Sequence, residues 1–218
     1  MADETTQKEN PSDQVVAYAV RHGRTVANEE NKFRGQIDVP LDENGKQDAK
    51  DAAKFLADKQ IGQAWTSPLS RSKDTAKVIL KGRGIKSIPD DALLPLDAGK
   101  FAGKSKEKYR AKMDYYEAHP DETIPGGESL DDLHVRARRP LLKALRVGLR
   151  SKKPSLITAH ASILHVLGEL LHGDHEKALT EPGGVVEVIF DGKKFQARPV
   201  FKAKEETGQE KKEDQYAS

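Results

Sequence analysis

An apolar run that ends in Arg21-His22-Gly23 constrains the fold of this chain more than any other stretch. The run Val15 to Val20 is short and carries no helical charge pattern, so it predicts a strand buried on both faces. A second apolar run, Ser155 to Ala159, ends in His160. Ligands usually bind at the carboxyl ends of parallel strands. If these two strands lie side by side, His22 and His160 meet at such an edge.

The rest of the chain alternates helical and strand patterns. We expect two further strands, over Gln63–Thr66 and Gly84–Ile88, and a final hairpin of Val185–Phe190 and Lys194–Phe201. The first two expected helices begin at Lys46, after a turn at Asn44-Gly45, and at a Ser67 or Ser70 cap, from which the helix runs through Leu80. Three more helices are expected over Lys104–Ala118, from Glu128-Ser129 to about Arg150, and over Ala161–Leu171. This order predicts the α/β class. The expected architecture is a three-layer α/β/α sandwich with a mostly parallel sheet.

Length and composition limit the remaining possibilities. A chain of 218 residues fits one α/β domain, which we expect over residues 14–201, with polar disordered tails over 1–13 and 202–218. The net charge of +2 is too small to indicate nucleic-acid binding. Cysteine is absent, which excludes a disulfide framework and a thiolate nucleophile. With no signal-peptide pattern and no long apolar run, we expect a cytoplasmic protein that does not bind membranes.

Cationic and imidazole side chains follow the predicted strands. Arg21 and His22 follow the first strand, Arg71 lies in the first turn of the helix after the second, and His160 follows the fourth. Thr25 and Asn28 add a hydroxyl and an amide. This grouping suits a phosphate, with a histidine as nucleophile. His172, Asp174 and His175 are typical of a helix that ends at Gly173, so we expect neither a metal site nor a cofactor.

Five short motifs, in this order, carry a resemblance to a known family. They are RHGRTVAN, FRGQIDVPL, TSPLSRSKDTA, PGGESL and a strand that ends in AH. Together they resemble the histidine phosphatase superfamily, which has the phosphoglycerate-mutase-like fold. The resemblance extends from about Val15 to Phe201, nearly the whole of the predicted domain.

The resemblance assigns roles residue by residue. It implies that His22 is the nucleophile and that Arg21, Arg71 and His160 take part in catalysis and bind the phosphoryl group, with Thr25, Asn28 and Gly35 also in the phosphate site. The implied reaction is hydrolysis of a small phosphate monoester through a phosphohistidine, without a metal. A phosphoglycerate-type mutase is the alternative enzyme. A catalytically weak phosphate-binding or interaction module is the alternative outside enzymes.

The general acid is where the chain departs from the family. The family's glutamate, four residues before a glycine, falls on Pro95, which cannot donate a proton. Asp97 is the nearest substitute, and Glu128 is the second candidate. We expect the small insert over about 97–128, which contains a lysine-rich helix, to set substrate specificity. Arg24 stands where the family often has an acidic residue; its charge is expected either to widen the anion site or to reach solvent.

Overall fold

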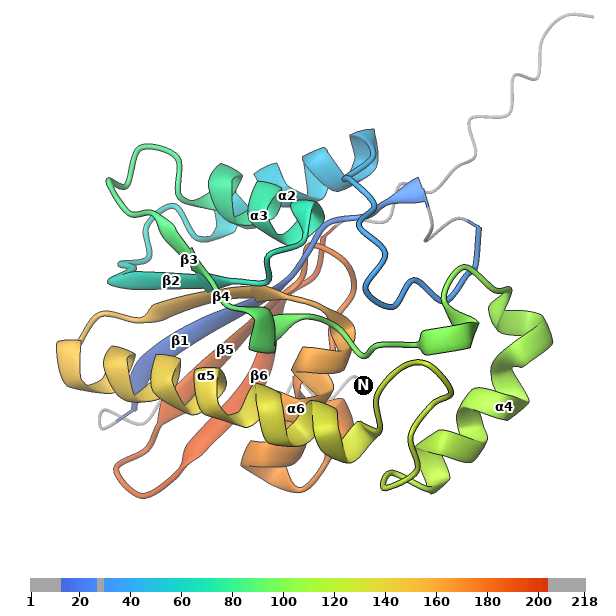
Figure 1. The fold of residues 1–218 in the computed structure, drawn as a ribbon. Helices are drawn as coiled ribbons and strands as arrows, with labels where there is room; N and C mark the ends of the chain where they lie inside the picture. The colour runs from blue at the N-terminus through green and yellow to red at the C-terminus, as the bar shows by residue number, and fades with distance from the viewer. Residues whose placement is uncertain (1–12, 27–29, 204–218) are drawn as a thin grey trace, which may run out of the picture.

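The computed structural model describes residues 13–26 and 30–203, and its centre is a six-stranded sheet (Figure 1). In spatial order the strands are β3 (Ser87–Pro89), β2 (Gln63–Thr66), β4 (Ser155–Ala159), β1 (Gln14–Arg21), β5 (Val185–Phe190) and β6 (Phe195–Phe201). The first four are parallel, whereas β5 and β6 pair antiparallel. The expected mostly parallel sheet is confirmed. The expected tails and Asn28 lie outside the described residues, except Asp13, Lys202 and Ala203.

Helices cover both faces of this sheet (Figure 1). On one face lie α2 (Glu43–Phe55) and α3 (Ser70–Ile79), and on the other α5 (Leu130–Ser151) and α6 (Ala161–His172). Helix α4 (Lys106–Ala118) lies at the side of the sheet, where its Met113 packs on Phe101 and Ile124. Within the described residues, short 3-10 helices cover Asp91–Leu93, Gly99–Phe101 and His175–Ala178. The three-layer prediction is therefore correct.

Strand β1 is buried on both faces, as its unbroken apolar run predicts. Tyr18 and Val20 pack in a cluster with Leu56 of the α2 side, whereas Ala17 and Ala19 pack in a cluster with Leu141 of α5. All four β1 residues are at most 3% exposed. Burial of apolar surface on both sides therefore fixes the strand that carries Arg21 and His22 at its end.

The predicted turn at Asn44-Gly45 is wrong, because both residues lie in the first turn of α2. The helix begins three residues earlier than expected, since the side chain of Asp42 accepts a hydrogen bond from the Gly45 N–H at 2.6 Å. Glycine is required at position 45 by close packing and not by a turn. A Cβ at this position would lie 1.9 Å from the carbonyl oxygen of Arg24, so only glycine lets the helix pack against the loop after β1.

Two other boundaries also differ from the prediction. Helix α3 begins after Leu69, and neither Ser67 nor Ser70 caps it; instead the Asp38 side chain accepts from the Ser70 N–H at 2.9 Å. The third strand covers only Ser87–Pro89, because Gly84 lies in a turn with φ +67°. Pro89 is tolerated there because β3 is an edge strand.

The described residues also bear on membrane insertion. No helix in that part of the chain has both the length and the apolar character needed to cross a bilayer.

Candidate active site

His22 and His160 lie side by side because their strands are neighbours. Arg21 of β1 pairs with Ala159 of β4, and the His22 N–H donates to the Ala159 carbonyl at 3.0 Å. Each histidine is the next residue after its strand's last paired position. Their ring centroids are 5.0 Å apart with an edge-on angle of 62°, and the two residues are 2% and 3% exposed. The sequence prediction that they meet at one sheet edge is confirmed.

The ring of His22 is oriented by its own loop. Its Nδ1 lies 2.7 Å from the Gly23 carbonyl oxygen. Because a carbonyl only accepts, Nδ1 carries the hydrogen and Nε2 keeps a lone pair. Burial, and next the positive charge of Arg71, hold the pKa of His22 well below its usual value. At neutral pH the ring is therefore uncharged, as a nitrogen nucleophile must be.

The loop after His22 is anchored to both covering helices. The Gly23 N–H donates to the Thr75 hydroxyl at 3.2 Å, and that hydroxyl donates to the Arg71 carbonyl at 2.8 Å. A Cβ on Gly23 would lie 2.2 Å from the Gly45 carbonyl oxygen. Thr75 thus connects the histidine loop to the first turn of α3, which carries Arg71.

Two arginines, Arg71 and the half-buried Arg21, are fixed by backbone carbonyls. Arg71, 1% exposed, donates to Ile37 at 2.8 Å and to Gly35 at 3.3 Å, and Arg21 donates to Thr180 at 2.8 Å. Among the described residues, the Nε atoms of Arg21 and Arg71 are buried without an acceptor. Burial, and then the charge of Arg34, lower the pKa of Arg71 to about 10. An anionic oxygen suits these donors.

Arg34 is a third cation that the sequence analysis did not select. Its Nη1 donates to the buried Thr25 hydroxyl at 2.8 Å. Burial, and then the charge of Arg21, lower its pKa to about 10. Arg34 also contributes to the lowered pKa of both His22 and His160, so its charge acts on the same site. Its one sequence signal is its place beside Gly35 in the FRGQIDVPL motif.

The remaining predicted phosphate-site residues have mixed outcomes. Thr25 lies near the site through its contact with Arg34, and Gly35 lends its carbonyl to Arg71. A side chain at Gly35, whose φ is +53°, would meet Ala98 at 3.1 Å. Asn28 lies outside the described residues. The assigned roles of all three stay predictions.

Arg24 neither widens the anion site nor simply reaches solvent. Its guanidinium binds the buried Asp48 carboxylate at 2.8 and 3.0 Å, and its backbone N–H binds the same carboxylate at 2.9 Å. Both expectations for Arg24 are therefore wrong. The Asp48 carboxylate of α2 neutralises the charge of Arg24. The same ion pair connects the loop after His22 to α2.

The two candidate acids differ in how their oxygens are used. Both Glu128 oxygens bind Arg136 of α5, at 2.6 and 2.8 Å, and one of them also accepts the Asp97 N–H at 2.8 Å. Both Glu128 oxygens are therefore already used as acceptors within the protein. Asp97 uses Oδ1 to accept the Gly99 N–H at 3.0 Å. No described residue bonds its Oδ2, so that oxygen is the one available to a substrate.

The loop that contains Asp97 borders the histidine site. The Pro95 carbonyl accepts from Gln36 at 3.2 Å, and the Leu96 N–H donates to Ser162, two residues after His160, at 3.1 Å. On the other side, the Lys106 N–H at the start of α4 donates to Asn31 at 2.9 Å. Partial burial, and then the charges of Arg34 and Arg21, lower the pKa of Lys106. The predicted lysine-rich helix therefore brings one lysine within electrostatic reach of the site.

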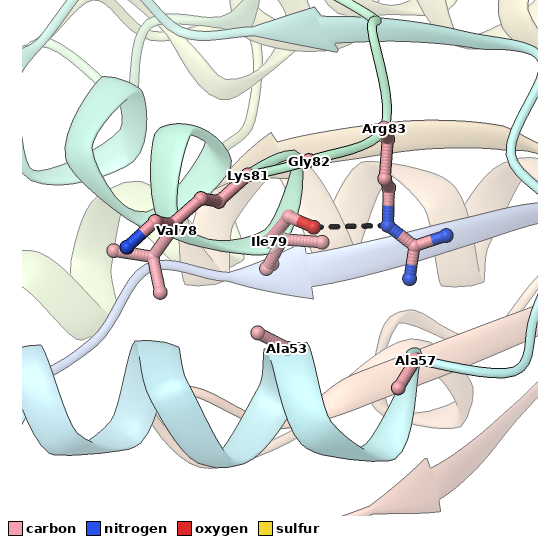
Figure 2. Close-up of a pocket in the computed structure, with 7 residues that line it drawn as sticks. All are labelled: Ala53, Ala57, Val78, Ile79, Lys81, Gly82 and Arg83. Carbon is pink, nitrogen blue, oxygen red and sulfur yellow. Dashed lines mark hydrogen bonds between the residues drawn. The ribbon is translucent and has the colours of Figure 1, made fainter.

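A separate hollow of about 310 Å³ lies between the carboxyl ends of α2 and α3 (Figure 2). Arg83 lines it and donates to the Ile79 and Lys59 carbonyls at 3.0 and 2.7 Å, so the guanidinium of Arg83 stabilises the local backbone. Arg71 is at the opposite end of α3.

The structure also shows no group of three or more His, Asp or Glu side chains within the described ranges that would hold a metal ion. His172 ends α6 before Gly173, as predicted.

The fold is α/β, and two histidines meet the positive charges of Arg21, Arg34 and Arg71 at the carboxyl edge of its sheet. Residues 17–200 match the model of the histidine phosphatase superfamily, branch 1. The chain belongs to this family, and the resemblance seen in its motifs is confirmed.

Curated relatives carry mutase names. A 2,3-bisphosphoglycerate-dependent phosphoglycerate mutase 2 of Gloeobacter violaceus is 31% identical over 170 residues, covering 72% of this chain and 74% of the relative. A 2,3-bisphosphoglycerate-dependent phosphoglycerate mutase of Mesorhizobium japonicum is 34% identical over 183 residues, with 78% and 89% covered.

Similar solved structures carry phosphatase names. The α-ribazole phosphatase of Shigella flexneri has a TM-score of 0.72 at 19% identity, covering 84% of this chain and 95% of that one. A mycobacterial glucosyl-3-phosphoglycerate phosphatase has a TM-score of 0.70 at 23% identity, with 86% and 98% covered. At these identities the likeness establishes the fold. Family and names support an enzyme that acts on phosphate groups.

Proposed function

We propose that this protein is a metal-independent phosphatase that hydrolyses small phosphate monoesters through a phosphohistidine on His22. One observation carries the proposal. An uncharged His22, with its lone pair on Nε2, lies 5.0 Å from the His160 ring and within the field of Arg21, Arg34 and Arg71. This combination supplies a nucleophile and the cations that hold a phosphoryl group.

In the first step, His22 Nε2 attacks phosphorus as the bond to the ester oxygen breaks. Arginine forks match the equatorial oxygens of the transferring group, where negative charge is spread. His160 donates a further hydrogen bond. The products of this step are phosphohistidine and the free alcohol.

Proton transfer completes the cycle. The Asp97 carboxylic acid gives its proton to the leaving oxygen, and the resulting carboxylate accepts a proton from the attacking water in the second step. Water forms the new bond to phosphorus, the bond to Nε2 breaks, and inorganic phosphate leaves. Pro95 supports this role for Asp97, because proline removes the family's usual acid.

The test compares an activated ester with an unactivated one in EDTA. We expect wild type to hydrolyse p-nitrophenyl phosphate and an alkyl phosphate, and His22→Ala to lose both activities. Asp97→Asn should reduce hydrolysis of the alkyl ester far more, since nitrophenolate leaves without a proton. Acid-labile ³²P on wild type but not on His22→Ala would identify the intermediate. A folded wild type that hydrolyses neither ester would refute the proposal in favour of a binding module.

A phosphoglycerate mutase is the second candidate, favoured by the names of the curated relatives and by Lys106 near Arg34 and Arg21. A lysine there suits the second anionic group of a phosphorylated acid. ³¹P NMR of 3-phosphoglycerate with 2,3-bisphosphoglycerate decides between the two. Conversion to the 2-phospho isomer supports the mutase, whereas release of inorganic phosphate supports the phosphatase.

A further inference from the structure

Two buried hydroxyls contact His160 on the side of β2 and α3. The Ser67 Oγ lies 2.8 Å from His160 Nε2, and the Ser72 Oγ lies 3.4 Å from the same nitrogen. Both serines are fully buried. Neither has a part in the reaction described above, although they touch a ring that is central to it.

The hydrogen bonds of Ser67 indicate the direction of its contact with His160. The Leu69 N–H donates to the Ser67 Oγ at 3.4 Å, so this oxygen already acts as an acceptor. Its own hydrogen is then available to His160. If Nε2 carried a hydrogen instead, the Ser67 hydroxyl hydrogen would need another acceptor, and the described residues offer none. His160 Nε2 is therefore the acceptor, and Ser67 is the donor.

An acceptor at Nε2 determines where the single hydrogen of the neutral ring lies. Burial, and then the proximity of His22, hold the pKa of His160 well below its usual value, so the ring has one hydrogen. With Nε2 occupied, that hydrogen is on Nδ1. This atom is buried and has no partner among the described residues.

We propose that Ser67 is a positioning residue that holds His160 in the tautomer with hydrogen on Nδ1, so that an uncharged ring donates to the phosphoryl group. The proposal rests on the phosphatase function for the use of that hydrogen. His22 and His160 then carry hydrogen on the same ring atom and use it oppositely. His22 donates its Nδ1 hydrogen to the Gly23 carbonyl, which leaves a lone pair on Nε2. His160 has its Nδ1 hydrogen available for the substrate.

The tautomer is measurable by ¹⁵N NMR of the imidazole nitrogens in the resting protein at pH 7, assigned with His160→Gln. We expect a protonated-type Nδ1 and a bare Nε2 for His160 in wild type. In Ser67→Ala the two tautomers should mix, kcat/KM should fall about 10-fold to 100-fold, and inorganic phosphate should inhibit more weakly by a similar factor, by analogy with the loss of outer hydrogen-bond partners of metal-binding histidines. Ser67→Thr, which keeps a hydroxyl, should recover most of the loss.

Thr66→Val is the matched control. The Thr66 hydroxyl is also buried, but it bonds Thr158 and the Ser67 carbonyl and does not touch His160. Its loss should leave the His160 tautomer and kcat/KM unchanged. The inference is overturned if the His160 ring of wild type carries its hydrogen on Nε2, or if Ser67→Ala leaves the ¹⁵N tautomer of His160 unchanged. Either result overturns it even where turnover is normal. If wild type has the expected tautomer but no turnover on any ester, the phosphatase proposal fails and the tautomer assignment stands.

Discussion

Replacing Arg136 by methionine should destabilise the protein by about 3 kcal/mol, because it removes the charged partner of a mostly buried carboxylate and one donor from each of three carbonyls. The guanidinium makes five hydrogen bonds, two to Glu128 and one each to the carbonyls of Ala92, Leu94 and Pro95. The two side chains are 23% and 16% exposed. Loss of one partner from a buried pair costs about 3 to 5 kcal/mol, and residual contact with water places this pair at the lower end.

Urea unfolding of wild type, Arg136→Met, Glu128→Gln and the double variant measures the effect. The double variant should recover a part of the loss, since no unpaired charge remains. Arg139→Gln, exposed on the same helix, should change stability by less than about 0.5 kcal/mol. Because Glu128 also holds the Asp97 N–H, hydrolysis of the alkyl ester should fall more than that of p-nitrophenyl phosphate. A loss below about 1 kcal/mol in Arg136→Met would refute the reasoning.

Three further predictions follow from the site. His22 and His160 have lowered pKa values in the folded state, and burial lowers the pKa of His165 to about 4, so below about pH 6.5 the unfolded chain binds more protons. Stability should fall as pH drops from 6.5 to 5, with a slope approaching about 4.1 kcal/mol per pH unit for three histidines, and urea unfolding of His22→Gln should show about two thirds of it. Gly45→Ala should cost about 1 to 3 kcal/mol and reduce turnover, because its Cβ meets the Arg24 carbonyl; unchanged thermal unfolding would contradict this. Inorganic phosphate at 100 times its Kd should stabilise wild type by about 2.7 kcal/mol, and Arg71→Met should abolish the shift in a thermal scan.

The fold was predictable because its central strands are apolar over their whole length. The runs in β1 and β4 identify strands buried on both faces, and their neighbouring positions bring His22 and His160 together. Local sequence patterns were less informative about element boundaries that tertiary packing determines. Asn44-Gly45 has the composition of a turn, yet it begins a helix because Asp42 caps it and the backbone of Arg24 lies against Gly45.

The site was predictable only as far as its motifs reached. Arg21 ends one strand, His160 follows another, and Arg71 lies in the first turn of the helix after a third, so their positions along the chain indicate them. Arg34 does not, and it reaches the site through a contact with Thr25, nine residues away, that depends on how the intervening loop packs. In the same way, nothing in the sequence pairs Arg24 with Asp48, 24 residues later.

The partner of each arginine separates a ligand-binding role from a structural one. Arg24 and Arg136 bind carboxylates, so their charge is cancelled within the protein. Arg21 and Arg71 instead donate to backbone carbonyls, and within the described part of the chain neither guanidinium donates to a carboxylate. A carbonyl fixes the position of a guanidinium without neutralising it, which leaves the charge for an anion that arrives later. A carboxylate in place of these carbonyls would neutralise the guanidinium charge and weaken the affinity for phosphate.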